Sequence, residues 1–232
     1  MTDITQYFKG EFLVSPTILL QKLQQVKAFV FDWDGVFNGG TKDEDGSSQF
    51  SEIDSMGTNL MRFNHFLRNN VAPVTAIITG EKNKGAFAFA KREHFHAVYA
   101  GIKYKPDAVK HLCKEHHLKP EEICFFFDDA IDLSSAAVCG LRIMAYRDCN
   151  PLLLQYAKKH QMADYITRAD GAHYAVREAT EMLMGLSGQY EESVQARMDF
   201  NDLYKRFLKA RNKPEPVLYG EDDGKIVEMK TL

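Results

Sequence analysis

Short apolar runs alternate with amphipathic segments along most of this chain. The apolar runs at 28–31, 74–80, 97–100 and 123–127 are of strand type, and a segment with helical spacing follows each of them. This alternation predicts a parallel sheet with right-handed crossovers and helices on its faces. In such a sheet the ligand crevice lies outside the carboxyl ends of the strands. We therefore expect an α/β fold with any binding site at that edge.

The first of these runs ends in two aspartates, Asp32 and Asp34, which are followed by Gly35. Residues i and i+2 of an extended strand point the same way, so both carboxylates can face one pocket. Two crowded carboxylates suit a hard cation such as Mg²⁺, with one aspartate as nucleophile and the other in proton transfer. The structural alternative is an Asp-Gly turn that closes a strand.

Polar residues also follow the other three runs. Thr79 ends the second run and Lys105 lies just beyond the third, while Asp128, Asp129 and Asp132 follow the fourth. Parallel strands bring these positions to one edge of the sheet. Taken singly, Thr79 is typical of a helix N-cap and Lys105 of a solvated loop charge. Their convergence therefore weighs more than any one motif.

The composition restricts the classes of function. Hydrophobic residues make up 45% of the 232 residues and charged residues 26%, as in ordinary soluble globular proteins. A formal net charge of -3 gives no support for a basic nucleic-acid surface. The apolar runs are too short for a membrane span, and the first residues lack the pattern of a signal peptide. We expect a cytoplasmic protein with neither nucleic acid nor membrane as a partner. The four cysteines form no Cys-x-x-Cys pair, so we expect incidental thiols.

The chain divides into three expected regions. These are an N-terminal extension over 1–25, a main domain over 26–186, and a C-terminal helix and tail over 187–232. Within the main domain the Gly-rich, acidic stretch at about 36–57 predicts a hairpin flap beside the aspartates, and a helix follows at about 58–69. Residues 189–210 predict one amphipathic helix that packs on its own domain or at a subunit contact, of which we favour the contact. Residues 212–232 predict a poorly ordered tail or a short strand arm.

The order and spacing of Asp32, Thr79, Lys105 and Asp128 resemble the haloacid dehalogenase (HAD) superfamily of phosphotransferases. Because no large domain intervenes between the first two motifs, the chain is similar to the capless branch. That resemblance implies a Rossmann-like HAD fold, with a parallel sheet sandwiched by helices, a small β-hairpin flap and no large cap domain.

Within this branch, the residues from about 26 to 186 resemble phosphatases of 3-deoxy-octulosonate 8-phosphate and of nonulosonate 9-phosphates. The stretches that carry the resemblance are 32–37, Phe50 and Asp54 in the flap, 77–82, 101–105 and 171–178. In the octulosonate branch an arginine usually follows Thr-Gly. Glu81 and Lys82 stand here and resemble the nonulosonate branch.

The resemblance implies a Mg²⁺-dependent, stepwise phosphoryl transfer. Asp32 would form an aspartyl-phosphate, while Asp34 would protonate the leaving oxygen and then activate water. Asp32, the backbone carbonyl of Asp34, and Asp128 would hold Mg²⁺. Thr79 would bind a phosphoryl oxygen and Lys105 would offset its charge.

The resemblance also implies further contacts and an assembly. Gly80, Glu81 and Arg177 would bind the substrate, a small phosphorylated sugar acid, and Asp129 and Asp132 would orient the site. The family forms homotetramers in which subunits cover one another's active sites, so we expect a homo-oligomer.

Several positions depart from the family pattern. Phe127 stands where glycine usually precedes the acid pair, and it is expected to crowd the backbone beside a metal ligand. Ser55 replaces a flap glycine, the usual glycine-rich run is here Gly171-Ala172-His173-Tyr174, and the chain extends beyond the family's usual end. These departures leave open an alternative: a weak or inactive relative that serves as a binding or structural subunit. A receiver domain fits worst, because its phosphorylated aspartate lies on the third strand.

Overall fold

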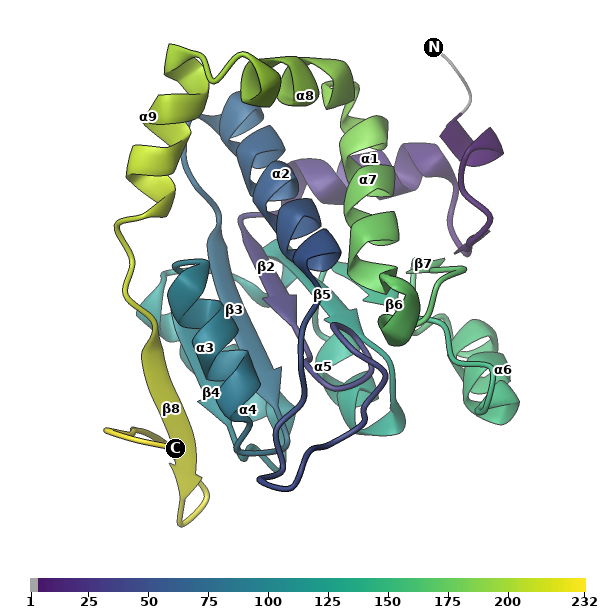
Figure 1. Cartoon of the computed structure of the whole chain (residues 1–232). Helices are drawn as coiled ribbons and strands as arrows, with labels where there is room; N and C mark the ends of the chain where they lie inside the picture. Colours follow the sequence, from purple (N-terminus) through teal and green to yellow (C-terminus); the bar gives the residue numbers. More distant parts are fainter. Residues whose placement is uncertain (1–3) are drawn as a thin grey trace.

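The computed structural model describes residues 4–232, which form one mixed sheet with helices on both faces (Figure 1). The strand order is β1-β7-β6-β5-β2-β3-β4-β8-β9. Neighbouring strands are parallel except in the outermost pairs, β1 with β7 and β8 with β9. The strands are β1 (Glu11–Phe12), β2 (Ala28–Phe31), β3 (Val74–Thr79), β4 (Ala97–Ala100), β5 (Ile123–Phe127), β6 (Leu141–Met144), β7 (Tyr165–Ile166), β8 (Val217–Asp222) and β9 (Lys225–Glu228).

Helices follow most strands, as the alternating pattern predicts. The α-helices are α1 (Pro16–Gln25), α2 (Glu52–Asn69), α3 (Lys84–Arg92), α4 (Lys105–Glu115), α5 (Leu133–Ala136), α6 (Pro151–Lys159), α7 (Ala175–Ser187), α8 (Tyr190–Met198) and α9 (Asp202–Arg211). Short 3-10 turns are η1 (Ile4–Gln6), η2 (Pro120–Glu122), η3 (Ala130–Asp132) and η4 (Gly171–His173).

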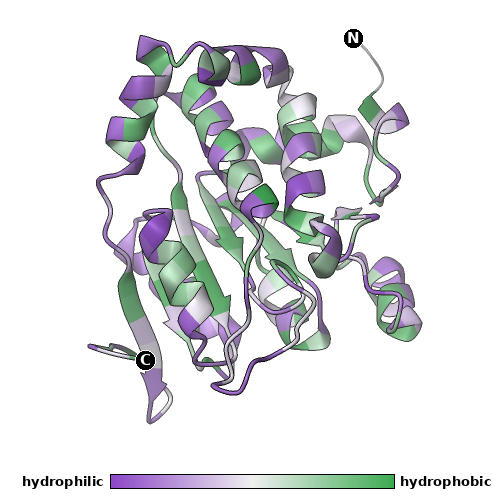
Figure 2. Cartoon of the chain, in the orientation of Figure 1, coloured by the Kyte–Doolittle hydropathy of each residue, from purple (hydrophilic) through white to green (hydrophobic). Residues whose placement is uncertain are grey.

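The sheet separates two apolar cores. Alternate residues of β2 face opposite sides, so Phe29 and Phe31 pack with α1, α2, α3 and α7, whereas Val30 packs with α4, α5 and α6. Figure 1 shows the first group of helices in front of the sheet and α4 and α5 behind it. Because both faces are covered, the central strands are apolar along their length and appear as the green middle of Figure 2.

The site lies at the carboxyl end of β2, the middle strand of the sheet. Phe31 pairs with Ile77 of β3 on one side and with Phe126 of β5 on the other. After β2 the chain builds β3 and β4 on one side, and β5, β6 and β7 on the other. Such a change of direction leaves a crevice at the strand ends. The residues that follow β2, β3 and β5 therefore meet there.

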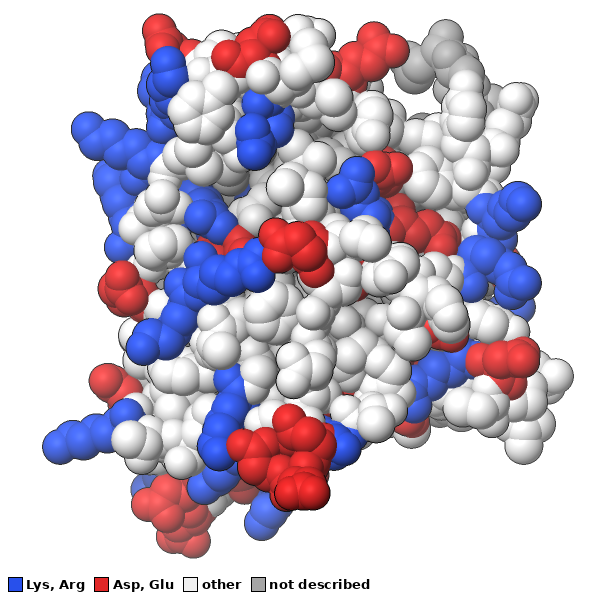
Figure 3. Space-filling view, viewed as in Figure 1, with Lys and Arg blue, Asp and Glu red and all other residues white. Residues whose placement is uncertain are grey.

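The predicted hairpin flap is not formed. Residues between β2 and α2 make a loop, with a turn in which the Gly46 N–H donates to the Asp43 carbonyl. The stretch is rich in glycine and short polar side chains, which favour turns over paired strands. Figure 3 shows acidic side chains at the lower edge of the molecule, where this loop lies in Figure 1.

Helix α2 begins at Glu52, six residues before the expected start. The side chain of Ser51 accepts a hydrogen bond from the Ile53 N–H and so caps the helix. Acidic residues in the first turn, Glu52 and Asp54, suit the positive end of the helix dipole. The loop is therefore shorter than the 36–57 that the sequence predicts.

The C-terminal region differs from its predicted form. The expected single helix breaks into α8 and α9, because Phe200 adopts a left-handed backbone (φ 48°) and Asn201 caps α9. Part of the apolar face packs on α2 of the same chain, with the rings of Phe63 and Phe207 5.2 Å apart. Val194 and Met198 stay exposed, and the expected subunit contact stays a prediction. The tail takes the strand-arm alternative: it forms β8, which pairs in parallel with β4, and β9, which returns as a hairpin.

The N-terminal extension also joins the sheet, through the pairing of β1 with β7. Residues 1–3 of that predicted extension lie outside the described part of the chain. The division at residues 25 and 186 stays a prediction. Among the helices of the described residues, none combines the length and the apolar composition that crossing a bilayer requires.

Candidate active site

Lys105 is held between two carboxylates at the centre of the site. Asp32 follows β2, and its N–H donates to the Phe126 carbonyl of β5 at 2.8 Å. Lys105 begins α4 and donates to Asp32 Oδ1 at 2.6 Å and to Asp132 Oδ1 at 2.5 Å. Burial alone would lower the pKa of Lys105, but the charges of Asp32 and Asp132 outweigh it and raise this pKa. The lysine is therefore a fixed cation.

Asp128 is the carboxylate of the site whose oxygens lack aligned hydrogen-bond donors among the described residues. It follows β5 and is 1% exposed, with Arg147 Nε 2.6 Å from its Oδ2. Neither of its oxygens accepts an aligned hydrogen bond from any residue that the structure describes. Burial, followed by the charge of Asp32, raises the pKa of Asp128 to about 9. The same two causes raise the pKa of Asp132 to about 7.

Oxygens of Asp32, Asp128 and Asp132 all lie within 4.8 Å of one another. Hard divalent cations such as Mg²⁺ take oxygen ligands, usually from one or two carboxylates and water. Asp128 offers two buried oxygens without aligned donors. Both oxygens of Asp132 already accept, Oδ1 from Lys105 and Oδ2 from the Asp129 N–H, whereas Lys105 donates to Oδ1 of Asp32. The donor set therefore fits a divalent cation bound chiefly through Asp32 and Asp128.

Ser48, in the loop before α2, holds Asp34. Its hydroxyl donates to Asp34 Oδ1 at 2.6 Å and accepts from Trp33 Nε1 at 2.9 Å and from Asn83 Nδ2 at 2.8 Å. Because N–H donors already point at Ser48 Oγ, its own hydrogen must point to Asp34. Lys42 pairs with the other oxygen of Asp34. The loop thus fixes Asp34 at the mouth of the site.

These residues surround a cleft of about 460 Å³. Thr79, at the end of β3, lies in its wall and accepts a hydrogen bond from the Glu81 N–H at 3.3 Å. The lining residues are Asp32, Asp34, Gly39, Gly40, Thr79, Gly80, Glu81, Lys105, Asp128, Asp129, Ile131 and Arg147. Several carboxylates therefore share one opening with the cations of Lys105 and Arg147.

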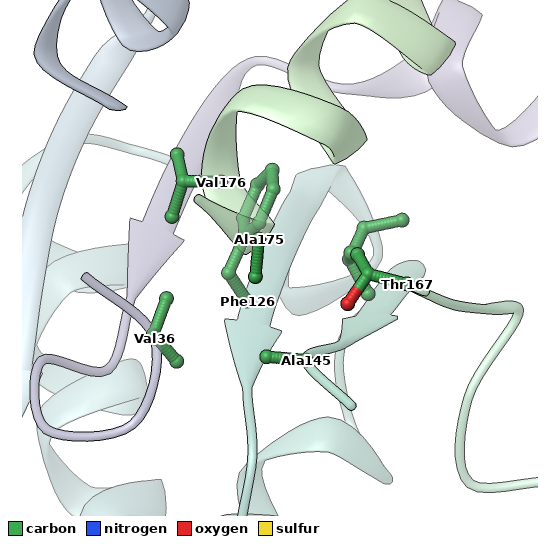
Figure 4. Close-up of a pocket in the computed structure, with 7 residues that line it drawn as sticks. Val36, Phe126, Ala145, Thr167, Ala175 and Val176 are labelled. Carbon is green, nitrogen blue, oxygen red and sulfur yellow. The ribbon is translucent and has the colours of Figure 1, made fainter. Parts of the chain in front are cut away.

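Apolar packing supports the site from one side. Val36, Phe126, Ala145 and Val176 converge from the turn after β2, from β5, from the end of β6 and from the start of α7 (Figure 4). The small gap between them has no exposed polar lining, so it offers water no partner. This packing fixes the turn that carries Asp34 against the sheet.

The comparisons agree with this geometry. No family model matches the chain. The 3-deoxy-D-manno-octulosonate 8-phosphate phosphatase KdsC of Salmonella typhimurium is 28% identical over 184 residues, 78% of this chain and 90% of the relative. The crystal structure of a probable YrbI family phosphatase from Pseudomonas syringae is 27% identical, with a TM-score of 0.65 over 78% of this chain and 98% of that one.

The chain has the capless haloacid dehalogenase fold. A 3-deoxy-D-manno-octulosonate 8-phosphate phosphatase from Moraxella catarrhalis, solved with magnesium, phosphate and KDO, shares this fold at 22% identity, with a TM-score of 0.65 over 77% of this chain and 97% of that one. The predicted resemblance, the α/β fold without a large cap and the class of enzyme, a HAD-type phosphatase, are confirmed.

Most of the predicted site residues meet in this HAD-fold cleft. The sequence places Asp32, Asp34, Thr79, Lys105 and Asp128 at strand ends, and the structure lines the cleft with all five. Gly80, Glu81 and Asp129 join them there, and Asp132 lies behind Lys105. The roles predicted for these residues stay predictions.

Arg177 lies elsewhere, near the start of α7. Its guanidinium donates to Glu181 Oε1 at 2.6 Å, and its backbone N–H donates to Asp54 Oδ1 at 2.8 Å. It is not among the residues that line the described cleft. Its predicted role in substrate binding gains no support from this position within one chain.

Phe127 does not crowd the site, contrary to the expectation from the sequence. It is fully buried in the core behind the sheet, where its ring lies parallel to that of Phe125 at 5.8 Å. Adjacent strand residues point to opposite faces, so a side chain at 127 is directed into the core. The departure from glycine therefore changes packing and leaves Asp128 in place.

Sequence reasoning missed two residues of the HAD-fold site, Arg147 and Ser48. Arg147 follows β6 by three positions, so the strand-end rule that singled out Lys105 also applies to it. Ser48 carries no comparable signal, because its importance depends on contacts with Trp33, Asn83 and Asp34 that only the folded loop creates.

Proposed function

We propose that this protein is a phosphatase that hydrolyses a small phosphorylated sugar acid, of the octulosonate or nonulosonate class. The observation that carries the proposal is the pairing of Lys105 with Asp32 beside the unsatisfied Asp128, in a cleft that also contains Asp34 and Thr79. The phosphatase names of the similar proteins support the reaction and the substrate class.

Asp32 would be the nucleophile. Its carboxylate oxygen would attack phosphorus and form an aspartyl-phosphate, while the bond from phosphorus to the sugar oxygen breaks. Asp34, positioned by Ser48 and Lys42, would act in its protonated form and give that proton to the sugar oxygen. Asp34 would then take a proton from water as the water attacks phosphorus and releases Asp32.

Two groups would stabilise the phosphoryl group during both steps. The ammonium of Lys105 lies 2.6 Å from Asp32, so it would also lie close to a phosphoryl group bound there. The hydroxyl of Thr79 would donate to a phosphoryl oxygen. Gly80 and Glu81 follow Thr79 in the wall of the cleft and would contact the sugar acid.

We propose Mg²⁺ as the cofactor, held by Asp32, Asp128 and the backbone carbonyl of Asp34. When bound, the cation would draw the phosphoryl oxygens into place and offset their charge. Asp129 and Asp132 would keep the ligands oriented: the Asp129 N–H donates to Asp132 Oδ2 at 3.3 Å, and Asp132 accepts from Lys105.

Location and assembly complete the proposal. We propose a cytoplasmic enzyme, which its four free cysteines fit. We also propose the homo-oligomer that the family resemblance implies, with a tetramer as the expected form. Arg177 does not line the described cleft of its own chain. In such an assembly it would contact a substrate bound by a neighbouring subunit.

A phosphate-release screen tests the function. Purified protein with Mg²⁺ is offered octulosonate and nonulosonate phosphates together with ordinary sugar phosphates. Asp32→Asn and Asp34→Asn remove the two proposed chemical groups, and Asp107→Asn removes an exposed carboxyl of α4 as a matched control. We expect turnover of a sugar-acid phosphate by wild type and Asp107→Asn only.

Two results would contradict the proposal. Equal hydrolysis by Asp32→Asn would exclude Asp32 as the nucleophile. If the wild type binds a divalent cation but releases no phosphate from any substrate of the panel, the alternative is favoured: an inactive relative that serves as a binding or structural subunit.

A further inference from the structure

Arg147 enters the site from the loop after β6 and covers Asp128. Its Nε lies 2.6 Å from Asp128 Oδ2, and about a quarter of its side chain is exposed to the cleft. A Cβ atom at Gly35 would lie 2.2 Å from a terminal nitrogen of Arg147 and 2.0 Å from Asp128 Oδ2. The glycine at position 35, whose φ of +88° also favours glycine, therefore leaves room for this pair.

The contact lacks the geometry of a permanent structural ion pair. A guanidinium that anchors a buried carboxylate usually makes two aligned bonds. The chain contains such a pair: Arg142 donates from Nε to Asp164 Oδ2 at 3.2 Å and from a terminal nitrogen to Oδ1 at 2.7 Å. Arg147 instead places Nε 2.6 Å from Asp128 Oδ2, and neither carboxylate oxygen of Asp128 accepts an aligned hydrogen bond from the part of the chain that the structure describes.

The charges explain why a cation lies there. Three carboxylates, Asp32, Asp128 and Asp132, are buried within reach of one another, and Lys105 hydrogen-bonds to two of them. Asp128 is left with Arg147 as its neighbouring cation within the described residues. Burying an unpaired carboxylate costs several kcal/mol, so this guanidinium stabilises the cleft when no other cation is present.

A divalent cation would use the same oxygens of Asp128. The guanidinium and the metal cannot both occupy that face, and two positive charges so close would repel. We propose that Arg147 is a displaceable counter-ion: it covers Asp128 until a divalent cation binds, and the released guanidinium then binds the anionic substrate in the cleft. The identity of the substrate in this inference rests on the proposed function. The competition between the guanidinium and the metal rests on the geometry of Asp128.

The proposal couples metal binding to anion binding. In the absence of an anion, the metal must break the contact between Arg147 and Asp128, so its affinity is lowered. An anion in the cleft gives the released guanidinium a new partner, so it raises the metal affinity. By linkage, the metal raises the anion affinity by the same factor.

Metal titration of the stripped full-length protein tests the competition. Mg²⁺ binding is measured by calorimetry, without substrate, for wild type and for Arg147→Gln. Loss of a charge-assisted contact predicts affinity about ten- to a hundredfold higher in the variant. Arg168→Gln is the matched control, because it removes the same net charge as Arg147→Gln. The Arg168 guanidinium lies over the Tyr146 ring, 5.7 Å from its centroid. The Arg168→Gln variant should bind Mg²⁺ as wild type does.

A conservative variant and a second ligand complete the test. Arg147→Lys keeps the charge but not the reach or shape of the guanidinium, so its Mg²⁺ affinity should lie between those of wild type and Arg147→Gln. Inorganic phosphate should tighten Mg²⁺ binding to wild type, and this coupling should shrink at least severalfold in Arg147→Gln. Far-ultraviolet circular dichroism confirms that each variant is folded.

The outcomes separate this inference from the proposed function. Equal or weaker Mg²⁺ binding by folded Arg147→Gln would overturn the competition, even if the enzyme hydrolyses sugar-acid phosphates. An equal rise in Mg²⁺ affinity in Arg168→Gln would show that the rise comes from net charge alone, and it would also overturn the competition. The predicted affinities, together with a wild type that releases no phosphate from any substrate, would support the counter-ion and overturn the phosphatase proposal alone.

Discussion

Lys105 Nζ lies 2.6 Å from Asp32 Oδ1, and both side chains are almost fully buried. The ion pair joins the first turn of α4 to the carboxyl end of β2, two elements that are separated by α2, β3, α3 and β4 in the chain. Besides its proposed part in the reaction, the pair matters for stability, because each partner would be costly to bury alone.

Replacement of Lys105 by methionine should destabilise the protein and abolish turnover. The change leaves Asp32 and Asp132 without their cation, which costs about 3–5 kcal/mol of unfolding free energy at pH 8. The loss should be smaller at pH 5, because Asp132, whose pKa is already about 7, then holds a proton. Urea unfolding at both pH values measures the difference. Wild-type stability at pH 8 would contradict the prediction.

Replacement of Ser48 by alanine should impair catalysis more than binding. It removes the donor to Asp34 and leaves buried N–H groups of Trp33 and Asn83 without their acceptor, at a cost of about 1–3 kcal/mol. We expect kcat to fall about tenfold or more with KM nearly unchanged. Ser47→Ala is the control, since it removes a hydroxyl from the neighbouring position of the same loop. Equal kinetics in the two variants would exclude the positioning role.

Replacement of Phe127 by alanine should affect stability and not chemistry. The ring is fully buried behind the sheet, so its removal should cost about 3–5 kcal/mol. Phosphate release well below the melting temperature should keep the wild-type kcat. Phe127→Leu should lose less stability, because it leaves a smaller cavity. A large fall in kcat without a change in melting temperature would indicate that Phe127 does act on the site.

Asp54 gives the protein a predictable dependence on pH. It is fully buried, accepts from the Arg177 N–H and has a pKa raised by burial to about 7. An unfolded aspartate ionises near pH 4, so between about pH 4 and 7 the folded state binds the extra proton. Stability from this group is therefore present at low pH and is lost as pH rises to about 7.

The variant Asp54→Asn should remove that dependence. We expect it to match wild type near pH 4 and to exceed it by a few kcal/mol, as an order of magnitude, at pH 8. Urea unfolding across this range measures the effect, with Asp107→Asn as an exposed control. Parallel pH profiles for wild type and Asp54→Asn would refute the assignment.

The central fold was predictable because its signals are local. The apolar runs that form β2, β4 and β5 end at the residues that the sequence indicates, since buried parallel strands need uninterrupted apolar side chains. The parallel topology then assembled Asp32, Thr79, Lys105 and Asp128 without further information. These elements carry most of the site.

The parts that escaped prediction depend on distant contacts. The sequence leaves open a poorly ordered tail and a short strand arm for residues 212–232, and pairing with the edge of β4 is the distant contact that selects the strand β8. The break at Phe200 depends on one left-handed residue and an Asn cap within a sequence of helical spacing. The contact of Arg147 with Asp128 requires the folded loop after β6.

The place of β8 also sets an order of events during synthesis. β4 is translated more than a hundred residues before the strand that covers its edge. A chain still on the ribosome therefore has the strands of the catalytic cleft but an open sheet edge, which invites pairing with other nascent chains. Residues 217–222 close that edge, so the edge of β4 reaches its protected form only after these residues have emerged.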